Sequence, residues 1–190
     1  MAYDAYMRFL EPRIDGEAKL QDTYKPAPSG MVDNDKWISL SEYSFSATMA
    51  VTQSRSGGTG AATTGKGKFE PFTFKKNVDT TSMTLAFHAS AGTIFKTLVV
   101  NVFNSLGDAG GTKHEPFLFL TIVMKGAVIS GCKFNGGGGD ELPTEEITIT
   151  YGSISYKYDG FQVDPDSGEI KKGRHSEFNW NTITNSGSKS

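Results

Sequence analysis

Residues 68–103, KFEPFTFKKNVDTTSMTLAFHASAGTIFKTLVVNVF, predict a strand, one short helix and a second strand. Phe72 and Phe74 alternate with polar side chains, which is the period-two pattern of a half-buried strand. Asp79 and Thr80 offer N-cap oxygens for the helix that follows, and Gly92 offers the left-handed conformation in which helices often end. A lone helix in an otherwise β-rich chain has to cover part of a sheet, which restricts the possible folds sharply.

Periodic apolar patterns predict further strands at residues 3–9, 37–51, 117–124, 127–134, 147–151 and 154–158. The apolar parity shifts near Ser41 and Glu42, which indicates a β-bulge, and again at Gly152, which indicates a bulge or a barrel corner. The chain shows no alternation of strands and helices. The predicted fold class is therefore mainly β, a closed antiparallel β-barrel with one short α-helix.

The composition is that of a globular protein with 190 residues and a net charge of −2, which gives no reason to expect nucleic acid as a partner. No segment approaches the roughly 18 apolar residues that cross a bilayer, so we expect no membrane insertion. The first 20 residues lack the pattern of a secretory signal peptide, and Cys132 is the only cysteine, so no internal disulfide can form. We expect synthesis in the cytoplasm without a signal peptide.

We expect one principal domain at residues 1–165 and a C-terminal extension at residues 166–190. The extension is predicted to be partly flexible. Its last residues, 179–190, are polar and are expected to fray.

A segment from Gly60 to Lys66 fits the phosphate-binding pattern G-x-x-x-x-G-K, but Gly67 stands where a magnesium-binding Ser or Thr is required. A strand with Pro71 near its start follows, whereas a phosphate loop opens a helix. We therefore interpret the Gly-rich segment as a flexible loop rather than a nucleotide site.

Other patterns for chemistry are incomplete. Residues 164–169, DPDSGE, begin like a calcium loop but lack its later ligands, so a turn is the better interpretation. The three histidines lack neighbouring metal ligands, and Glu145 and Glu146 are adjacent near a strand, where they face opposite ways. We expect no enzyme activity, no catalytic residues, no cofactor and no metal, and infer a scaffold or binding protein.

The order of these segments resembles the Hcp family, the haemolysin-coregulated proteins that form the inner tube of the bacterial type VI secretion system. The resemblance spans about residues 3–160: YDAYMRFLEPRIDGEAKL, then WISLSEYSFS, a Gly-rich loop, KFEPFTFKKNVDTTSMTLAFHASAG and finally PTEEITITYGSISYKY. Ala18 departs from the serine usual after Gly-Glu. The family-motif residues are Gly16, Glu17, Phe72, Phe74, Lys76, Asp79, Gly92, Tyr156 and Tyr158.

The resemblance implies a phage-tail-tube-like barrel with one helix packed outside. It also implies a homohexameric ring, rings that stack into a hollow tube, a spike protein at its tip and a contractile sheath around it. The protein would be secreted to the extracellular space or a target cell on contraction, with effector proteins in its lumen. The loop at residues 53–68 would reach the neighbouring ring, through Arg55, Gly57, Gly58, Gly60, Lys66 and Lys68.

A closed ring needs two different complementary patches on each protomer. Trp37, Tyr43 and Met49 are candidates for such patches, and equally for core positions. Two alternatives remain open from the sequence. One is a tube protein of a related phage-tail-like contractile machine, and the other is a monomeric β-barrel that binds a small ligand.

Overall fold

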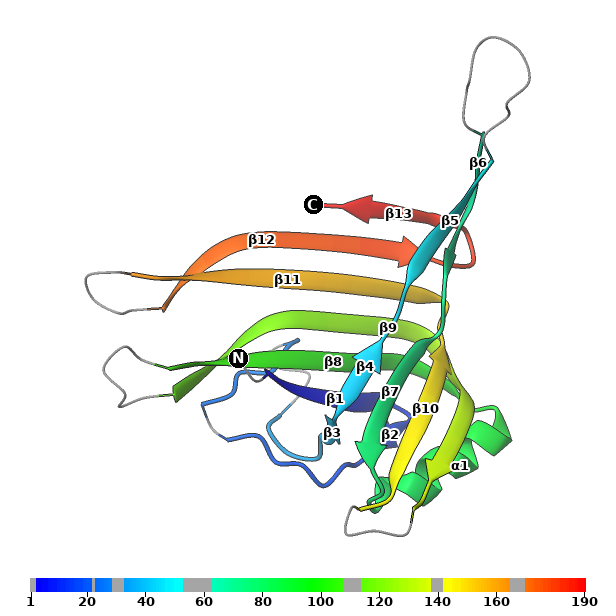
Figure 1. Ribbon diagram of the computed structural model, residues 1–190, viewed down its shortest axis with the longest axis horizontal. Coiled ribbons are helices and arrows are strands. Elements are labelled where there is room, and N and C mark those ends of the chain that lie inside the picture. The colour runs from blue at the N-terminus through cyan, green and yellow to red at the C-terminus, as the bar shows by residue number, and fades with distance from the viewer. Residues whose placement is uncertain are drawn as a thin grey trace.

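The computed structural model describes residues 3–21, 23–28, 33–52, 63–107, 114–137, 142–164 and 170–190 (Figure 1). One helix is present in these ranges, α1 at Thr81–Ala91. The strands are β1 Tyr3–Glu11, β2 Arg13–Ile14, β3 Ile38–Leu40, β4 Glu42–Ser44, β5 Ala47–Thr52, β6 Thr63–Phe69, β7 Phe72–Asn77, β8 Ile94–Gly107, β9 His114–Asn135, β10 Thr144–Thr150, β11 Ser153–Val163, β12 Ile170–Asn181 and β13 Ser186–Lys189.

Strand β9 organises the main sheet, because its 22 residues pair along both edges. Strand β8 lies along one edge, and β10 and then β11 lie along the other. Gly126 of β9 has a φ of 58°, a left-handed conformation that glycine adopts at little cost, and the chain turns there. The backbone N–H of Gly152, between β10 and β11, lies within hydrogen-bond distance of the carbonyls of Lys125 and Gly126. The strands on either side of this corner consequently run crosswise to each other (Figure 1).

The prediction of a closed barrel is wrong, because the hydrogen-bonded sheet stays open. Eleven strands form one sheet with the order β13-β12-β11-β9-β10-β7-β4, and β8, β1, β2 and β3 branch from β9. Strand β3 pairs with β1 and β4 pairs with β7, so these two short strands approach closure from opposite sides. Ser41 separates them, and no ladder joins β1 to β7 within the described ranges.

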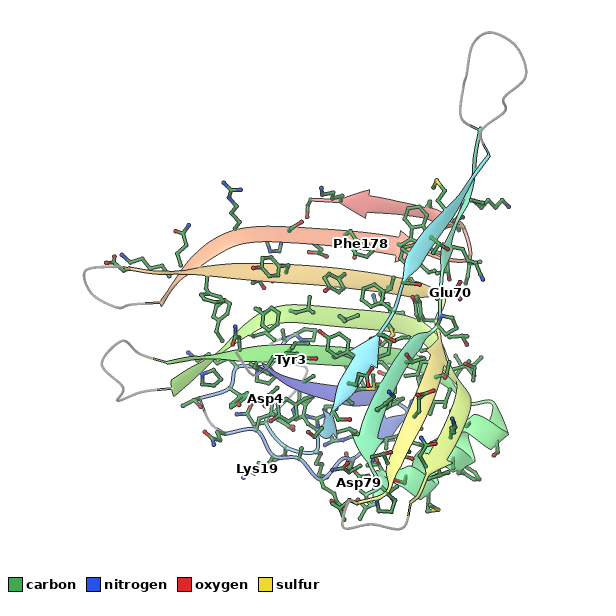
Figure 2. All side chains as sticks on the ribbon, viewed as in Figure 1. Tyr3, Asp4, Lys19, Glu70, Asp79 and Phe178 are labelled. Carbon is green, nitrogen blue, oxygen red and sulfur yellow. The ribbon has the colours of Figure 1, made fainter. Side chains whose placement is uncertain are left out.

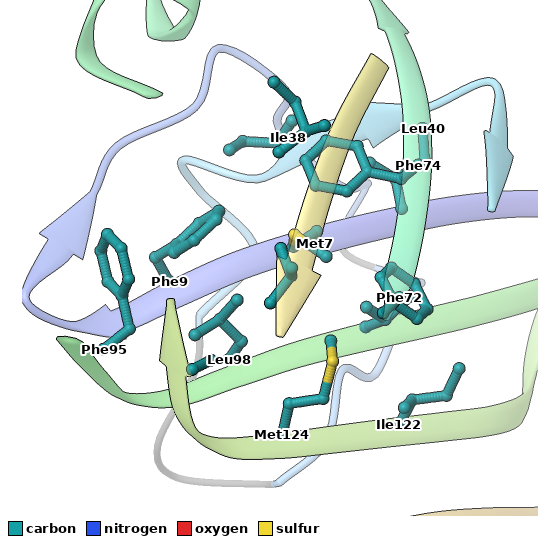
Figure 3. Packing of buried hydrophobic residues seen from close by; sticks show 14 of the residues in the cluster. Met7, Phe9, Ile38, Leu40, Phe72, Phe74, Phe95, Leu98, Ile122 and Met124 are labelled. Carbon is teal, nitrogen blue, oxygen red and sulfur yellow. The ribbon is translucent and has the colours of Figure 1, made fainter. Parts of the chain in front are cut away.

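The main core fills the space between the two crosswise parts of the sheet (Figure 3). Met7 and Phe9 from β1 belong to the same core cluster as Phe72 and Phe74 from β7, and all four side chains are buried. The predicted alternation of β7 is confirmed, since its burial pattern is strictly alternating. Apolar burial of this kind is the main favourable contribution to folding.

A second, smaller core lies on the other face of β1 and β8. Leu20 and Trp37 pack against Val99 and Phe103, and all four side chains are buried. The buried guanidinium of Arg8 lies 5.9 Å from the ring centre of Trp37 and donates a hydrogen bond to the carbonyl of Asp35. These contacts hold Leu20, Asp35 and Trp37, which lie between β2 and β3, against the sheet.

Helix α1 contacts β9 at one end of the molecule (Figure 1). Its buried side chains are Thr81, Ser82 and Leu85. Gly92 ends it with a φ of 62°, as the sequence predicted. No helix in the described parts of the chain is long and apolar enough to span a membrane.

The expected fraying of residues 179–190 is not what the structure shows. Strand β12 pairs with β11 along its length. Strand β13 pairs with β12, with Lys189 opposite Phe178 at one end and Ser186 opposite Asn181 at the other. The side-chain oxygen of Asn181 accepts hydrogen bonds from the backbone of Ile183 and Thr184 in the intervening turn. The sequence did not indicate this hairpin, because β13 is polar and exposed and so shows no apolar alternation.

Candidate assembly interface

A two-stranded ribbon, here called the arm, extends beyond the edge of the main sheet (Figure 1). It consists of β5 and β6, which form an antiparallel sheet of their own. Ala47 pairs with Phe69 at the foot of the arm, and Thr52 pairs with Thr63 at the other end of the ladder. The arm is covalently continuous with the main sheet at both ends, since β5 follows β4 and β6 leads into β7. Any contact made by the arm is therefore anchored in the core sheet.

The structure describes part of the predicted stacking loop. Lys66 and Lys68 lie on β6 with exposed side chains, and the ammonium of Lys68 lies 2.9 Å from a carboxylate oxygen of Glu70. The predicted loop is thus a strand from residue 63 onward. The other predicted stacking residues lie outside the described ranges: Arg55, Gly57, Gly58 and Gly60.

The strand also bears on the incomplete phosphate motif. Gly65, Lys66 and Gly67 are consecutive residues of β6, and the chain continues into β7 rather than into a helix. Phosphate loops present backbone N–H groups at a helix N-terminus, and this segment has no such helix. Its geometry favours the scaffold interpretation over nucleotide binding.

Five aromatic side chains at the foot of the arm form a group called the arm-base cluster: Phe45, Phe69, Tyr156, Phe178 and Trp180. Phe69 stacks on Trp180 with ring centres 5.5 Å apart, and Tyr156 stacks on Phe178 at 5.7 Å. Offset aromatic pairs at these separations are favourable beyond the area they bury. The cluster joins the foot of the arm to β11 and β12.

Two hydrogen bonds reinforce the same place, where Figure 2 shows Glu70 and Phe178. The backbone N–H of Glu70 donates to the carbonyl of Ser46 at 2.9 Å, which closes the arm across its two strands. The hydroxyl of Tyr151 donates to the carbonyl of Glu70 at 3.1 Å. Burial, with a smaller effect of the Glu70 charge, raises the pKa of Tyr151 to about 12, so this hydroxyl keeps its proton at neutral pH.

A buried ionic group, here called the Lys76 cluster, lies at the start of α1. The Lys76 ammonium lies 2.7 Å from Glu145 and 2.8 Å from Asp79, and its side chain is 1% exposed. Ser82 of α1 donates a hydrogen bond to the same Glu145 oxygen at 2.8 Å. Buried charges are tolerated when they are paired and hydrogen-bonded in this way. The cluster joins β7, β10 and α1.

Asp79 also prepares the first turn of α1, near the position labelled in Figure 2. Its Oδ1 accepts hydrogen bonds from the backbone N–H and the hydroxyl of Thr81, at 2.8 and 2.6 Å. Burial favours the neutral acid, but the bonds from Lys76 and Thr81 outweigh it and hold the pKa of Asp79 below its usual value. Asp79 is therefore charged at neutral pH, and it bonds the first helical residue, Thr81, from the position before Thr80, which is the N-cap.

The Gly-Glu motif reaches the same helix end. Glu17 accepts a hydrogen bond from the backbone N–H of Thr80 at 3.2 Å. Gly16 passes so close to Trp37 that an added Cβ would lie 2.0 Å from the Trp37 carbonyl oxygen. Glycine is the one residue that permits this approach.

The structure thus brings Glu17, Lys76 and Asp79 together around one helix terminus, whereas the other family-motif residues lie elsewhere. Phe72 and Phe74 are in the main core, and Tyr156 belongs to the arm-base cluster. Gly92 ends α1, and Tyr158 is exposed on β11 with its ring edge toward Phe119. These residues have structural positions, and their roles in assembly remain predictions.

Sequence reasoning missed Glu145, Ser82, Phe178 and Trp180. Glu145 shares the parity of Ile147 and Ile149 on β10, and this alternation marks its inward direction. The aromatic side chains at 178 and 180 likewise share one face of β12. Trp180 stands in the segment expected to fray, 179–190, and Phe178 directly precedes it. The predicted orientation of Glu145 and Glu146 on opposite faces is consistent with their burial, since only Glu145 is buried.

The three candidate interface residues occupy different environments. Trp37 is buried in the second core, and Tyr43 is half-buried with its ring stacked 6.0 Å from that of Phe72. Met49 is exposed on the arm. Only Met49 is available for a contact with another molecule without rearrangement.

Helix α1 also exposes apolar side chains. Met83 and Phe87, four residues apart on one face, are 67% and 66% exposed. Ile94, just after the helix, is exposed as well. Contiguous exposed apolar surface in a folded protein indicates a contact with another molecule.

No group of three or more potential metal ligands occurs in the described ranges. Cys132 is half-buried, and burial raises the pKa of its thiol, with a smaller contribution from Glu145. A raised pKa keeps the thiol protonated, which is the unreactive form.

The sequence matches a family model described as "Type VI secretion system effector, Hcp" over residues 6–158. Comparison with curated proteins gives no match. A solved structure described as a type six secretion system protein is 23% identical, with a TM-score of 0.73, and the alignment covers 98% of this chain and 100% of that one.

Hcp1 from Salmonella typhimurium is 15% identical with a TM-score of 0.64, covering 99% of this chain and 100% of that one. A chain of the anti-feeding prophage baseplate is 13% identical with a TM-score of 0.51, covering 80% of this chain and 89% of that one. These structural similarities concern the fold.

Proposed function

The chain belongs to the Hcp family of the type VI secretion system, and on that basis we propose that it assembles as a homohexameric ring whose copies stack through their arms. The chain is a structural subunit of the secretion tube. The match to the family model over residues 6–158 is the observation on which the proposal depends. Residues 166–190 are proposed as a C-terminal extension of the Hcp-like domain at 1–165.

Stacking requires a surface that leaves the body of the subunit, and the arm supplies one. Its exposed Lys66, Lys68 and Met49 are accessible, and the arm-base cluster anchors it to the sheet. An isolated two-stranded ribbon is marginally stable in water. Contact with a neighbouring ring would therefore stabilise the arm as well as join the rings.

Ring closure requires a second kind of contact. The exposed face of α1 with Met83 and Phe87 is one proposed patch of this heterologous interface. A stable contact buries on the order of 800 Å² per partner, so further residues must take part.

The proposed partners are further copies of this chain, the spike protein, the contractile sheath and effector proteins in the lumen. The proposed role requires no catalysis and no cofactor. The prophage baseplate similarity fits a shared architecture among contractile injection machines.

Size-exclusion chromatography with light scattering tests the proposal. We expect a particle of about six times the 20.5 kDa chain mass, because a heterologous interface closes into a ring. Electron microscopy should show hollow rings, and tubes at higher concentration. A monomer at every concentration would instead favour a monomeric ligand-binding protein. If the protein forms rings but is found in purified phage-tail-like particles of the producing strain, the related contractile machine would be favoured.

A further inference from the structure

We propose that the C-terminal hairpin, β12 and β13, holds the arm in the orientation needed for ring stacking. This inference rests on the proposed function of the arm. The hairpin lies beyond residue 158, where the match to the family model ends. It extends the assembly role to a segment that the match to the family model does not reach.

Trp180 makes the central contact. Its indole stacks on Phe69, the last residue of β6, with ring centres 5.5 Å apart and planes 30° apart. Phe178, two residues earlier on the same face of β12, approaches Phe69 at 6.3 Å. Because Phe69 stands directly before the turn into β7, these two rings fix the point at which the arm leaves the sheet.

Two glycines lie beside the indole at opposite corners of its six-membered ring, and Gly187 leaves space that the ring occupies. A methyl group at Gly67 of the arm would lie 3.5 Å from Cζ2 of Trp180. A methyl group at Gly187 of β13 would lie 2.5 Å from Cε3, which is closer than real contacts allow. The indole is therefore held between the arm and β13, and β13 has the position of a support behind it.

The contact depends on ring stacking and not on hydrogen bonding. The indole Nε1 of Trp180 is buried, and it has no hydrogen-bond partner in the described parts of the chain. A phenylalanine at this position keeps an aromatic face and loses no hydrogen bond. Trp180→Phe is thus a conservative variant that should preserve the support, whereas Trp180→Ala should remove it.

The hairpin is itself firmly attached, so it can act as a support. Thr182 donates a hydrogen bond through its hydroxyl to the carbonyls of Tyr151 or Gly152, each at 2.9 Å. The backbone N–H of Thr182 also donates to the carbonyl of Gly152. These bonds attach the hairpin to the corner between β10 and β11.

Three measurements on full-length protein test the proposal: particle mass by light scattering, tube formation by electron microscopy, and tryptic cleavage after Lys66 and Lys68. We expect Trp180→Ala to form rings of unchanged mass but few tubes. Cleavage at the two lysines should be roughly two- to tenfold faster, the change in open population expected for one lost aromatic pair. Trp180→Phe should resemble the wild type.

Phe161→Ala is a matched control, because Phe161 is a half-buried aromatic residue of β11 that contacts Phe117 and is not part of the arm-base cluster. It should leave arm cleavage and tubes unchanged. Phe69→Ala removes the same contact from the arm side, and it replaces Trp180→Ala if that variant fails to fold. The double variant with Trp180→Ala and Phe69→Ala should be cleaved little faster than either single variant, since all three lose the same contact.

Unchanged cleavage in Trp180→Ala and Phe69→Ala would overturn the proposal, as would faster cleavage with normal tube formation. Failure of the proposed function has a different signature. A wild-type protein that forms no rings would refute the assembly role, whereas rings that stack normally without the Trp180 contact would refute only the support by the hairpin.

Discussion

The ammonium of Lys76 lies 2.7 Å from the carboxylate of Glu145, and both side chains are almost completely buried. Lys75, its neighbour on β7, pairs at the same distance with Glu42 on the exposed side of the strand. Adjacent lysines therefore form the same type of ion pair, one buried and the other exposed to solvent. This difference determines how much each pair matters for stability.

Lys76→Met should destabilise the subunit by roughly 3–5 kcal/mol, because it leaves the buried Glu145 carboxylate without its cation. Lys75→Met should change stability little, because exposed ion pairs contribute little. Urea unfolding of both variants compares them directly. The double variant Lys76→Met with Glu145→Leu should recover stability relative to Lys76→Met, and equal losses in the two single variants would contradict the assigned role of the cluster.

Asp79→Asn should make the free energy of unfolding vary less with pH in the acid range. The pKa of Asp79 is lowered in the folded state, so its contribution is present above the unfolded value of about 4 and is lost as pH falls through the folded value. Asparagine still caps a helix, so the variant removes mainly the charge. The free energy of unfolding of the wild type should exceed that of the variant at pH 7, and the gap should shrink below about pH 4. A gap that stays constant down to pH 2 would count against this assignment.

Gly16→Ala should be much more damaging than Gly92→Ala. An alanine at 16 would collide with the Trp37 backbone, and such overpacking costs at least the roughly 1–3 kcal/mol typical of cores. Gly92 has no atom within 4 Å of an added Cβ, so only its left-handed φ opposes alanine, at about 1–2 kcal/mol. Thermal unfolding of the two variants measures this order, and a reversed order would show that the Gly16 contact relaxes easily.

Met83→Ser combined with Phe87→Ser should leave the fold of the subunit intact but weaken the ring. Both side chains are largely exposed, so little burial within the subunit is lost. Light scattering over a dilution series should show a shift toward smaller species. Thr84→Ala, on an exposed position of the same helix, is the control. A ring as stable as the wild type would exclude this face from the interface.

The sequence predicted the elements of the fold better than their closure. The alternation of Phe72 and Phe74 predicted β7. The parity switch predicted a β-bulge near Ser41 and Glu42 within one strand, whereas the structure has a break at Ser41 between β3 and β4. The same interruption prevents closure, because it splits the strand that would have completed the barrel. Periodicity reports which way side chains face and not how far a ladder continues.

The residues of the candidate interface also differ in whether the sequence could reveal them. Lys76 and Asp79 were identified from a motif, but their partner Glu145 is 69 residues away from Lys76 and could be found only through its parity. The alternation of Phe178 and Trp180 could show that they share a face, but not their contact with an arm whose foot lies more than 100 residues earlier. Long-range partners of this kind are fixed by topology, which a local pattern does not contain.

Strand β7 continues directly from the arm and pairs antiparallel with β10 from Phe72–Ile149 to Asn77–Thr144. Figure 1 shows the arm and β7 running in nearly the same direction. A pull on the arm would therefore load the β7–β10 hydrogen bonds in shear, many at once, rather than opening them one by one. Single-molecule pulling on the arm should accordingly give a higher rupture force than pulling across β7, and a lower one would refute this mechanical role. If the arms join neighbouring rings as proposed, each subunit would transmit tension between its neighbours through its own sheet.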